Sequence, residues 1–246
     1  MDRFWSVLMP AGFQAFTDTG VYQIDGRTPN YQMVQSMAAD SAVGSLPLAR
    51  NDAGRTFMID LPSVTFTFSS VAGPMYAVLA SGAVGITLWG AKRNGSSYSV
   101  TFVTERPCNV RLFVFDQVPV AAGNFGLQVF DAGGRLVADS SKPFLRVLDV
   151  IFEDYMNGVG WTVEGAPSPP WHSRSYGVPV LISAIYSVHR AWSYDPGVVE
   201  LSSIRVDGGN VSWGTALYNG GRTPNIACFR EQYHSRFMVL DGTGIV

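Results

Sequence analysis

Residues 126–147 read GLQVFDAGGRLVADSSKPFLRV, and this stretch decides the fold class. Leu127 and Val129 before the central Asp-Ala-Gly-Gly, and Leu136 and Ala138 after it, are apolar at every second position. That spacing is the period of a half-buried β-strand. Asp bonds its own backbone in tight turns and Gly accepts a positive φ, so the central four residues favour a turn. The stretch therefore predicts a β-hairpin.

A related stretch occurs once earlier in the chain. Residues 12–33 read GFQAFTDTGVYQIDGRTPNYQM and align with 126–147 without a gap, 114 positions apart. The identical pairs are Gly12/Gly126, Gln14/Gln128, Phe16/Phe130, Gly20/Gly134, Asp25/Asp139 and Pro29/Pro143. A second pair of matching segments, RLFVFD at 111–116 and RFMVLD at 236–241, ends each copy. The sequence therefore indicates an internal duplication of one β unit.

The fold class that follows is all-β, with two tandem β-sandwich-like domains related by internal duplication. Each copy is long enough to bury a core of its own. The expected boundaries are an N-terminal lead-in at 1–11, copy one at 12–118, a linker at 119–125, and copy two at 126–246 with an inserted loop at 218–235.

Within the copies, short alternating segments predict the strands. In copy one we expect strands at 31–37, 56–61, 64–69, 97–104 and 110–116, and a polar loop at 38–54. The uncharged stretch 71–91 is long enough to cross a bilayer, but its glycines and Pro74 favour a hairpin of 75–80 with 83–89 over a membrane span. In copy two we expect strands at 144–152, 178–187, 198–206 and 210–217, and a proline-rich loop at 165–175.

Composition, charge and cysteine count limit the classes of function that the chain can have. The chain of 246 residues is 47% hydrophobic and 15% charged, which is typical of a globular protein with little charge on its surface. A net charge of −2 gives no basis for nucleic-acid binding. The two cysteines, Cys108 and Cys228, are too few for a disulfide scaffold and are expected as reduced thiols. The first residues do not resemble a signal peptide, so synthesis in a cytoplasm is expected.

Motifs for catalysis are absent from the sequence. The three histidines, His172, His189 and His234, lack the spacing of a metal site. No nucleophile elbow, phosphate loop or dinucleotide motif occurs. Adjacent Glu153 and Asp154 form the tightest carboxylate pair for a glycosidase, but a solvated loop is the simpler interpretation. We therefore expect no enzyme, no cofactor and no metal.

Aromatic residues gather in copy two, where they suit sugar stacking, protein contact or core packing. Trp213 and Tyr186 lie on expected strands and are assigned to the core. Arg222 belongs to a GRTPN segment that occurs twice in the chain, at 26–30 and 221–225, and that suits a docking loop. The candidate contact residues are Trp171, His172, Trp192, Tyr194, Tyr218 and Arg222.

Three segments form a distinctive set: FDQVP at 115–119, FGLQVFDAGGRLV at 125–137 and DSS at 139–141. Together they resemble a family of small tail proteins of bacteriophages and prophages. Copy one carries the motif in weakened form, with Thr17 in place of the turn Asp. The resemblance implies a structural role in the virion near the tail tip or fibres, with other tail proteins as partners and no cofactor or catalytic residue.

The leading expectation is a tail component of the virion that acts by protein–protein contact, as a homo-oligomer or in several copies. The alternative is a receptor-binding module that recognises a host glycan or pilus through loops 165–175 and 218–235. A polysaccharide-degrading enzyme is a third reading, and we expect the isolated chain to release no sugar.

Overall fold

The computed structural model is all-β, as the alternating segments predict. It describes residues 14–16, 22–25, 30–50, 54, 56–70, 72–117, 126–154, 170–183, 189–192, 198–218, 228–229 and 234–246. No helix in this part of the chain is long and apolar enough to span a membrane. The expected lead-in at 1–11 and linker at 119–125, and most of the inserted loop at 218–235, lie outside the described residues.

Among the described residues, ten strands and one short helical turn precede residue 135. They are β1 (Gln14–Phe16), β2 (Tyr22–Asp25), β3 (Tyr31–Asp40), β4 (Ala42–Arg50), β5 (Thr56–Ser69), β6 (Met75–Ala80), the 3-10 turn η1 (Ser81–Ala83), β7 (Ile86–Asn94), β8 (Ser97–Thr104), β9 (Asn109–Gln117) and β10 (Gln128–Phe130). The later strands are β11 (Leu136–Asp139), β12 (Val147–Asp154), β13 (His172–Ser175), β14 (Val180–Ser183), β15 (His189–Trp192), β16 (Val198–Asp207), β17 (Asn210–Tyr218), β18 (Cys228–Phe229) and β19 (His234–Asp241).

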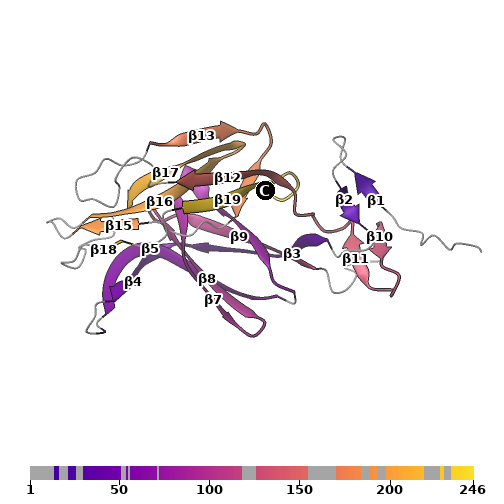
Figure 1. Ribbon diagram of the computed structural model, residues 1–246, viewed down its shortest axis with the longest axis horizontal. Coiled ribbons are helices and arrows are strands. Elements are labelled where there is room, and N and C mark those ends of the chain that lie inside the picture. The colour runs from indigo at the N-terminus through magenta and orange to yellow at the C-terminus, as the bar shows by residue number, and fades with distance from the viewer. Residues whose placement is uncertain are drawn as a thin grey trace, which may run out of the picture.

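Two antiparallel sheets form the body of the molecule (Figure 1). The six-stranded sheet has the order β12-β19-β14-β6-β9-β3. The larger sheet has the order β13-β17-β16-β7-β8-β5-β4, with β15 and β18 attached beside β16. Apolar side chains from both sheets meet in one core, in which Phe102, Leu112 and Val239 have no exposed surface. Two small hairpins, β1–β2 and β10–β11, lie together at one end of the molecule (Figure 1).

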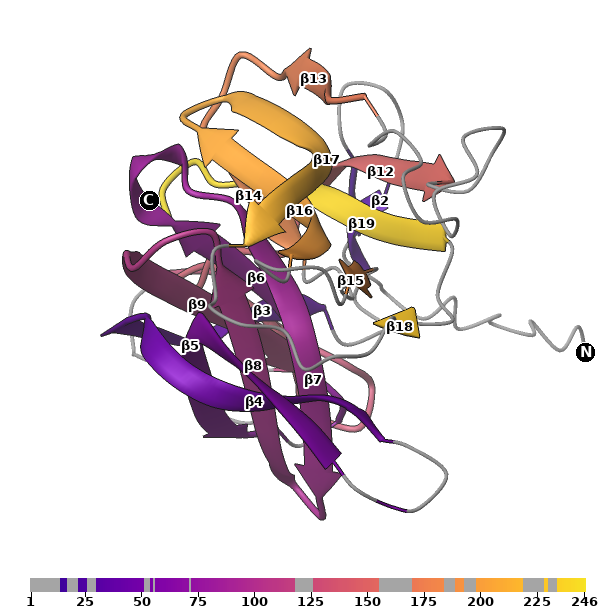
Figure 2. The same ribbon diagram turned by 90° about the vertical axis from the view of Figure 1, so that its left-hand side faces the viewer.

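The two copies are not separate sandwiches, and this corrects the expected division into domains. Strand β6 of the first copy pairs with β14 of the second, and β7 pairs with β16 at Ile86 and Ile204. The main core cluster also draws residues from both copies. Figure 2 shows strands from both ends of the chain side by side in one body. Residues 12–118 and 126–246 are therefore two halves of a single sandwich.

The aligned segments nevertheless have the same strand pairing in each half. In the hairpins, Gln14 faces Asp25 and Gln128 faces Asp139, and each ladder shifts register after its second pair. The pairing of β3 with β9 shifts at Val34, and that of β12 with β19 shifts at Leu148, which lies 114 positions later. A common origin of the two halves remains a prediction that these matching registers support.

The hairpin at 126–141 forms as predicted. The Asp131 carboxylate accepts hydrogen bonds from the amides of Gly133 and Arg135, both at 2.9 Å, and Gly134 has a φ of 78°. The alternation in β5 is also confirmed, because Val64 and its neighbours at alternate positions are buried and the threonines between them are exposed.

Other local expectations were wrong. The expected loop at 38–54 contains the end of β3 and all of β4, and β5 is one strand of 14 residues. The expected hairpin of 75–80 with 83–89 does not form, since β6 and β7 belong to different sheets. Turn η1, with φ values of 67° at Gly82 and 50° at Ala83, carries the chain from one sheet to the other. The proline-rich loop ends in strand β13.

Candidate protein-contact surface

Strand β12 lies at the edge of the six-stranded sheet and exposes apolar side chains. Among the described strands it pairs only with β19. Leu148, Val150 and Phe152 are 42, 61 and 52% exposed, whereas Ile151 between them is buried in the core. The outer face of β12 is therefore an apolar row, which is unusual for an edge strand open to water.

The inner face of β12 carries acidic residues that connect the two sheets. Asp149 forms an ion pair with Arg174 and accepts a hydrogen bond of 2.8 Å from the Tyr176 hydroxyl. Burial, followed by this hydrogen bond, raises the pKa of Tyr176 to about 12. The same hydrogen bond, with help from Arg174, lowers the pKa of Asp149. At neutral pH the pair is therefore an ionised carboxylate and a protonated phenol, which suits a structural link.

A second link lies four residues along the strand. Glu153 Oε2 accepts a hydrogen bond of 2.9 Å from Trp213 Nε1 and lies 3.7 Å from His172 Nε2. The His172 and Trp213 rings stack with centroids 5.7 Å apart. Glu153 therefore links β12 of the six-stranded sheet to β13 and β17 of the larger sheet, and it does not lie in a solvated loop. Within the described residues, no group of three His, Cys, Asp or Glu side chains could hold a metal ion.

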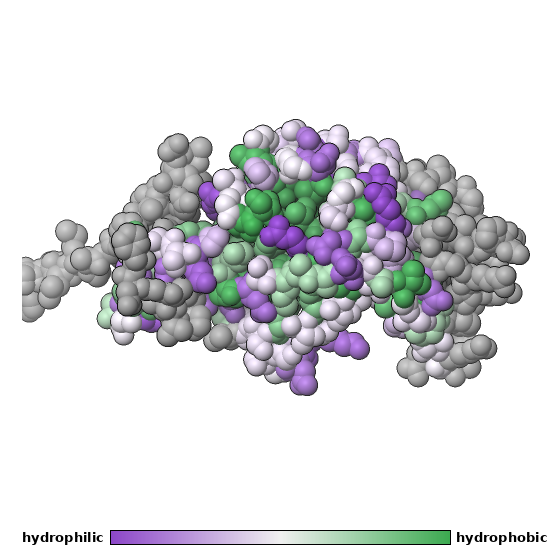
Figure 3. All heavy atoms as spheres, turned by 180° about the vertical axis from the view of Figure 1, so that it is seen from behind, coloured by the Kyte–Doolittle hydropathy of each residue, from purple (hydrophilic) through white to green (hydrophobic). Residues whose placement is uncertain are grey.

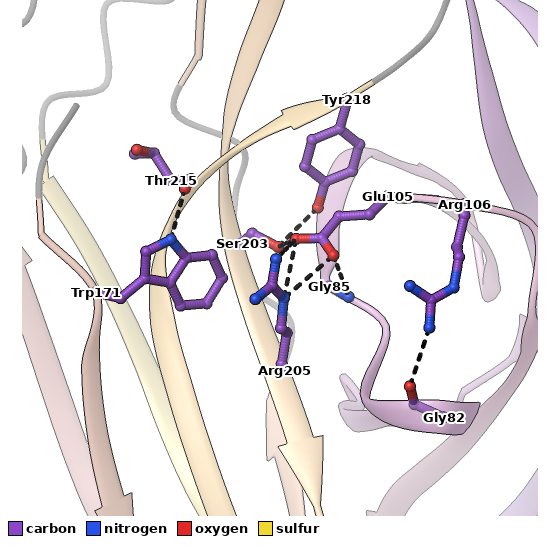
Figure 4. Close-up of polar contacts among 9 residues, drawn as sticks. All are labelled: Gly82, Gly85, Glu105, Arg106, Trp171, Ser203, Arg205, Thr215 and Tyr218. Atoms are coloured by element: carbon purple, nitrogen blue, oxygen red, sulfur yellow. Dashed lines mark hydrogen bonds and ion pairs between the residues drawn. The ribbon is translucent and has the colours of Figure 1, made fainter. Parts of the chain in front are cut away.

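A polar network beside Trp171 joins the two halves (Figure 4). Glu105, from the first half, accepts hydrogen bonds from both Nε and Nη2 of Arg205, from the Ser203 hydroxyl at 3.0 Å and from the Gly85 amide at 3.1 Å. The Arg205 guanidinium lies over the Trp171 ring, 4.1 Å from its centroid. The network connects the first half of the chain to the second. Its charged groups, Glu105 and Arg205, bind each other rather than a ligand.

The sequence-predicted contact residues have different positions. Trp171 and His172 are adjacent at the start of β13 and stay partly exposed, although Trp171 Nε1 donates to the Thr215 carbonyl at 2.9 Å (Figure 4). Tyr218 is buried and its hydroxyl donates to Ser203, so its assignment to a contact loop was wrong. Trp192 lies on β15. Tyr194 and Arg222 lie outside the described residues.

Sequence reasoning missed the exposed row on β12. The segment VLDVIFED was expected only as part of a strand at 144–152. Leu148, Val150 and Phe152 alternate with Asp149 and Glu153, which is the pattern of a strand with one apolar face. That local pattern does not tell whether the apolar face is covered by the rest of the molecule. On the face drawn in Figure 3, hydrophobic surface also gathers near the middle and is bordered by hydrophilic residues.

Comparisons with family models, with curated proteins and with solved structures gave no match for this chain.

Proposed function

We propose that the chain is a structural protein of a bacteriophage tail, at the tail tip or a fibre-attachment point, and that it acts by protein–protein contact. One observation carries the contact role. Eleven large hydrophobic residues in the described part are exposed, and six of them fall within 26 consecutive positions: Leu127, Phe130, Val147, Leu148, Val150 and Phe152. Such a concentration of exposed apolar side chains marks interaction surfaces.

The tail assignment rests on the motif that forms the second hairpin. That hairpin lies at one end of the molecule, with Leu127 and Phe130 each about half exposed (Figure 1). It is anchored by Gln32, whose amide nitrogen donates to the carbonyls of Asp139 and Lys142, at 2.5 and 2.7 Å, and whose carbonyl accepts from the Asp139 amide at 2.8 Å. A rigidly held hairpin that presents apolar side chains suits a part that docks into a larger particle.

Purified particles test the proposal. Mass spectrometry of gradient-purified virions, from a strain whose phage or prophage carries the gene, should detect the chain in the tail fraction. The variant Leu127→Ser/Phe130→Ser should fold but be depleted from tails, because the hairpin would lose its apolar contacts. The matched control is Leu217→Ser, at a residue 63% exposed on a different sheet, which should assemble normally. Absence of the wild-type chain from particles that are complete without it would overturn the proposal.

A further inference from the structure

We propose that a pocket between the second hairpin and the turn after β19 binds the phosphate group of a phosphorylated sugar. The pocket has a volume of about 280 Å³, close to the lower end of the roughly 300–1,000 Å³ that small-molecule sites occupy. Its walls come from the segment 140–146 and from Thr243 and Gly244. The inference goes beyond the proposed contact function and does not depend on it, because none of the exposed apolar residues that carry that function lines the pocket.

Two basic side chains give the pocket its positive charge. The Lys142 ammonium group has no ion-pair partner among the described residues. Nη2 of Arg146 contacts Asp241 Oδ2 at 3.1 Å and the Thr243 carbonyl at 3.4 Å, and the other guanidinium nitrogens make no hydrogen bond to the described part of the chain. The pocket therefore contains one cation without a counter-charge and a guanidinium that is held in place with donors still available.

Hydroxyl groups add neutral donors to the two cations. Ser140 Oγ accepts a hydrogen bond of 2.8 Å from the Leu127 amide, so the Ser140 hydroxyl proton remains available for an acceptor. The hydroxyls of Ser141 and Thr243 also line the pocket, and they make no hydrogen bond to any described residue. Cations combined with several hydroxyl donors suit an anion with many acceptor oxygens, and a phosphate group has more of these than a carboxylate.

One side of the pocket is apolar, which favours a ligand with a carbon skeleton over free phosphate. Pro143 and Phe144 line the pocket beside the basic residues. The Phe144 ring packs against Val129 and Val137 in the small core of the second hairpin, so its position is fixed. Ligand sites commonly combine an apolar wall with a few polar groups that orient the ligand. A sugar phosphate would place its ring on the apolar side and its phosphate among the donors.

Backbone hydrogen bonds fix the segment that forms the pocket wall. The Leu145 amide donates to the Tyr31 carbonyl at 2.9 Å. The Asp241 amide donates to the Arg146 carbonyl, also at 2.9 Å. The wall is therefore attached both to β3 of the first half and to β19 of the second. A site that is held in this way before the ligand arrives loses little conformational entropy on binding.

The aligned positions of the first half indicate that the fold does not require a basic residue at Lys142. Thr28 and Gln32 stand 114 positions before Lys142 and Arg146. Gln32 is buried and anchors the second hairpin, whereas the Lys142 side chain makes no polar contact with the described part of the molecule. Lys142 can therefore be replaced without loss of a structural bond, and its ammonium group is available to a ligand.

Calorimetric titration of the purified full-length chain tests the ligand class with three probes, which are glucose 1-phosphate, inorganic phosphate and uncharged methyl glucoside. We expect glucose 1-phosphate to bind most tightly, inorganic phosphate to bind more weakly because it leaves the apolar side empty, and methyl glucoside not to bind. Binding should weaken as the salt concentration rises, since salt screens the attraction between exposed charges. No binding of either phosphate, tighter binding of inorganic phosphate than of the sugar phosphate, or equal binding of methyl glucoside would overturn the inference.

A charge-removing variant tests the place of binding. Lys142→Gln should raise the Kd for glucose 1-phosphate roughly 10-fold, the effect of losing one hydrogen bond between charged groups. The matched control is Lys92→Gln, at an exposed lysine on β7 of the larger sheet, which should bind like the wild type. Thermal unfolding of both variants should match that of the wild type, so weaker binding would not reflect misfolding. A Kd that Lys142→Gln leaves unchanged, or that Lys92→Gln raises equally, would contradict binding in this pocket.

Discussion

Glu105, from the first half, bonds to Ser203 and Arg205 of the second half, and its removal should lower stability. Its side chain is 12% exposed and pairs with Arg205 at 2.9 Å. Glu105→Ala would leave the guanidinium, the Ser203 hydroxyl and the Gly85 amide without this acceptor, so we expect a loss of about 1–3 kcal/mol in the free energy of unfolding. Urea titration measures it. Arg135→Ala, which breaks an exposed ion pair with Asp131, should change stability little, and an equal effect of both would contradict the argument.

The raised pKa of Tyr176 predicts that the folded state loses stability at alkaline pH. Its pKa is raised to about 12 in the folded chain, so the folded state holds the phenol proton more tightly than the unfolded state does. The stabilisation is complete below the ordinary tyrosine pKa of about 10 and is lost as the pH rises from about 10 to 12. Unfolding of wild type and Tyr176→Phe, measured across this range, should show a stability difference that shrinks toward pH 12. A difference independent of pH would count against the Asp149 hydrogen bond.

At the scale of elements, two tight turns close aligned hairpins in the larger sheet. Gly95 between β7 and β8, and Gly208 between β16 and β17, have φ values of 61° and 56°. An L side chain in this region is strained, so Gly95→Ala and Gly208→Ala should each cost about 1–2 kcal/mol of stability. Gly90→Ala is the control, because Gly90 lies in β7 without a positive φ and no atom lies near its added Cβ. Thermal unfolding of the three variants would show whether the turns behave alike.

At the scale of the whole molecule, the shared sheets predict that neither half folds alone. Residues 1–118 would expose the β6 edge and half of the core, and residues 119–246 would expose β14 and the other half. Each separate half should therefore lack cooperative unfolding by circular dichroism, and the two should regain it when mixed. Cooperative unfolding of either half by itself would restore the interpretation as two independent domains.

The intact chain should then unfold in a single transition. Phe102 from the first half and Phe237 from the second belong to the same core cluster. Phe102→Ala and Phe237→Ala should therefore each lower the midpoint of the single transition, through a loss of about 3–5 kcal/mol in the free energy of unfolding. Fluorescence and circular dichroism should give coincident curves. Two separate transitions, each sensitive to one of the variants, would show independent cores.

The sequence by itself determined the all-β class and the hairpin at 126–141, because alternation and turn chemistry act between near neighbours. It also indicated Trp171 and His172 as exposed residues on the second half. It did not predict that β6 and β7 belong to different sheets, because a buried hairpin and a sheet crossing have similar local patterns.

Only the tertiary structure decided which strands are neighbours across the two halves and which strand lies at an edge. Both β14 and β12 carry large apolar residues, yet β14 is buried between β19 and β6, whereas β12 pairs only with β19 among the described strands. Alternation tells which residues share a face, but strand pairing over a hundred positions decides whether that face is covered. The physical reason is that burial depends on the long-range contacts of the whole sandwich, which the local pattern of apolar residues does not contain.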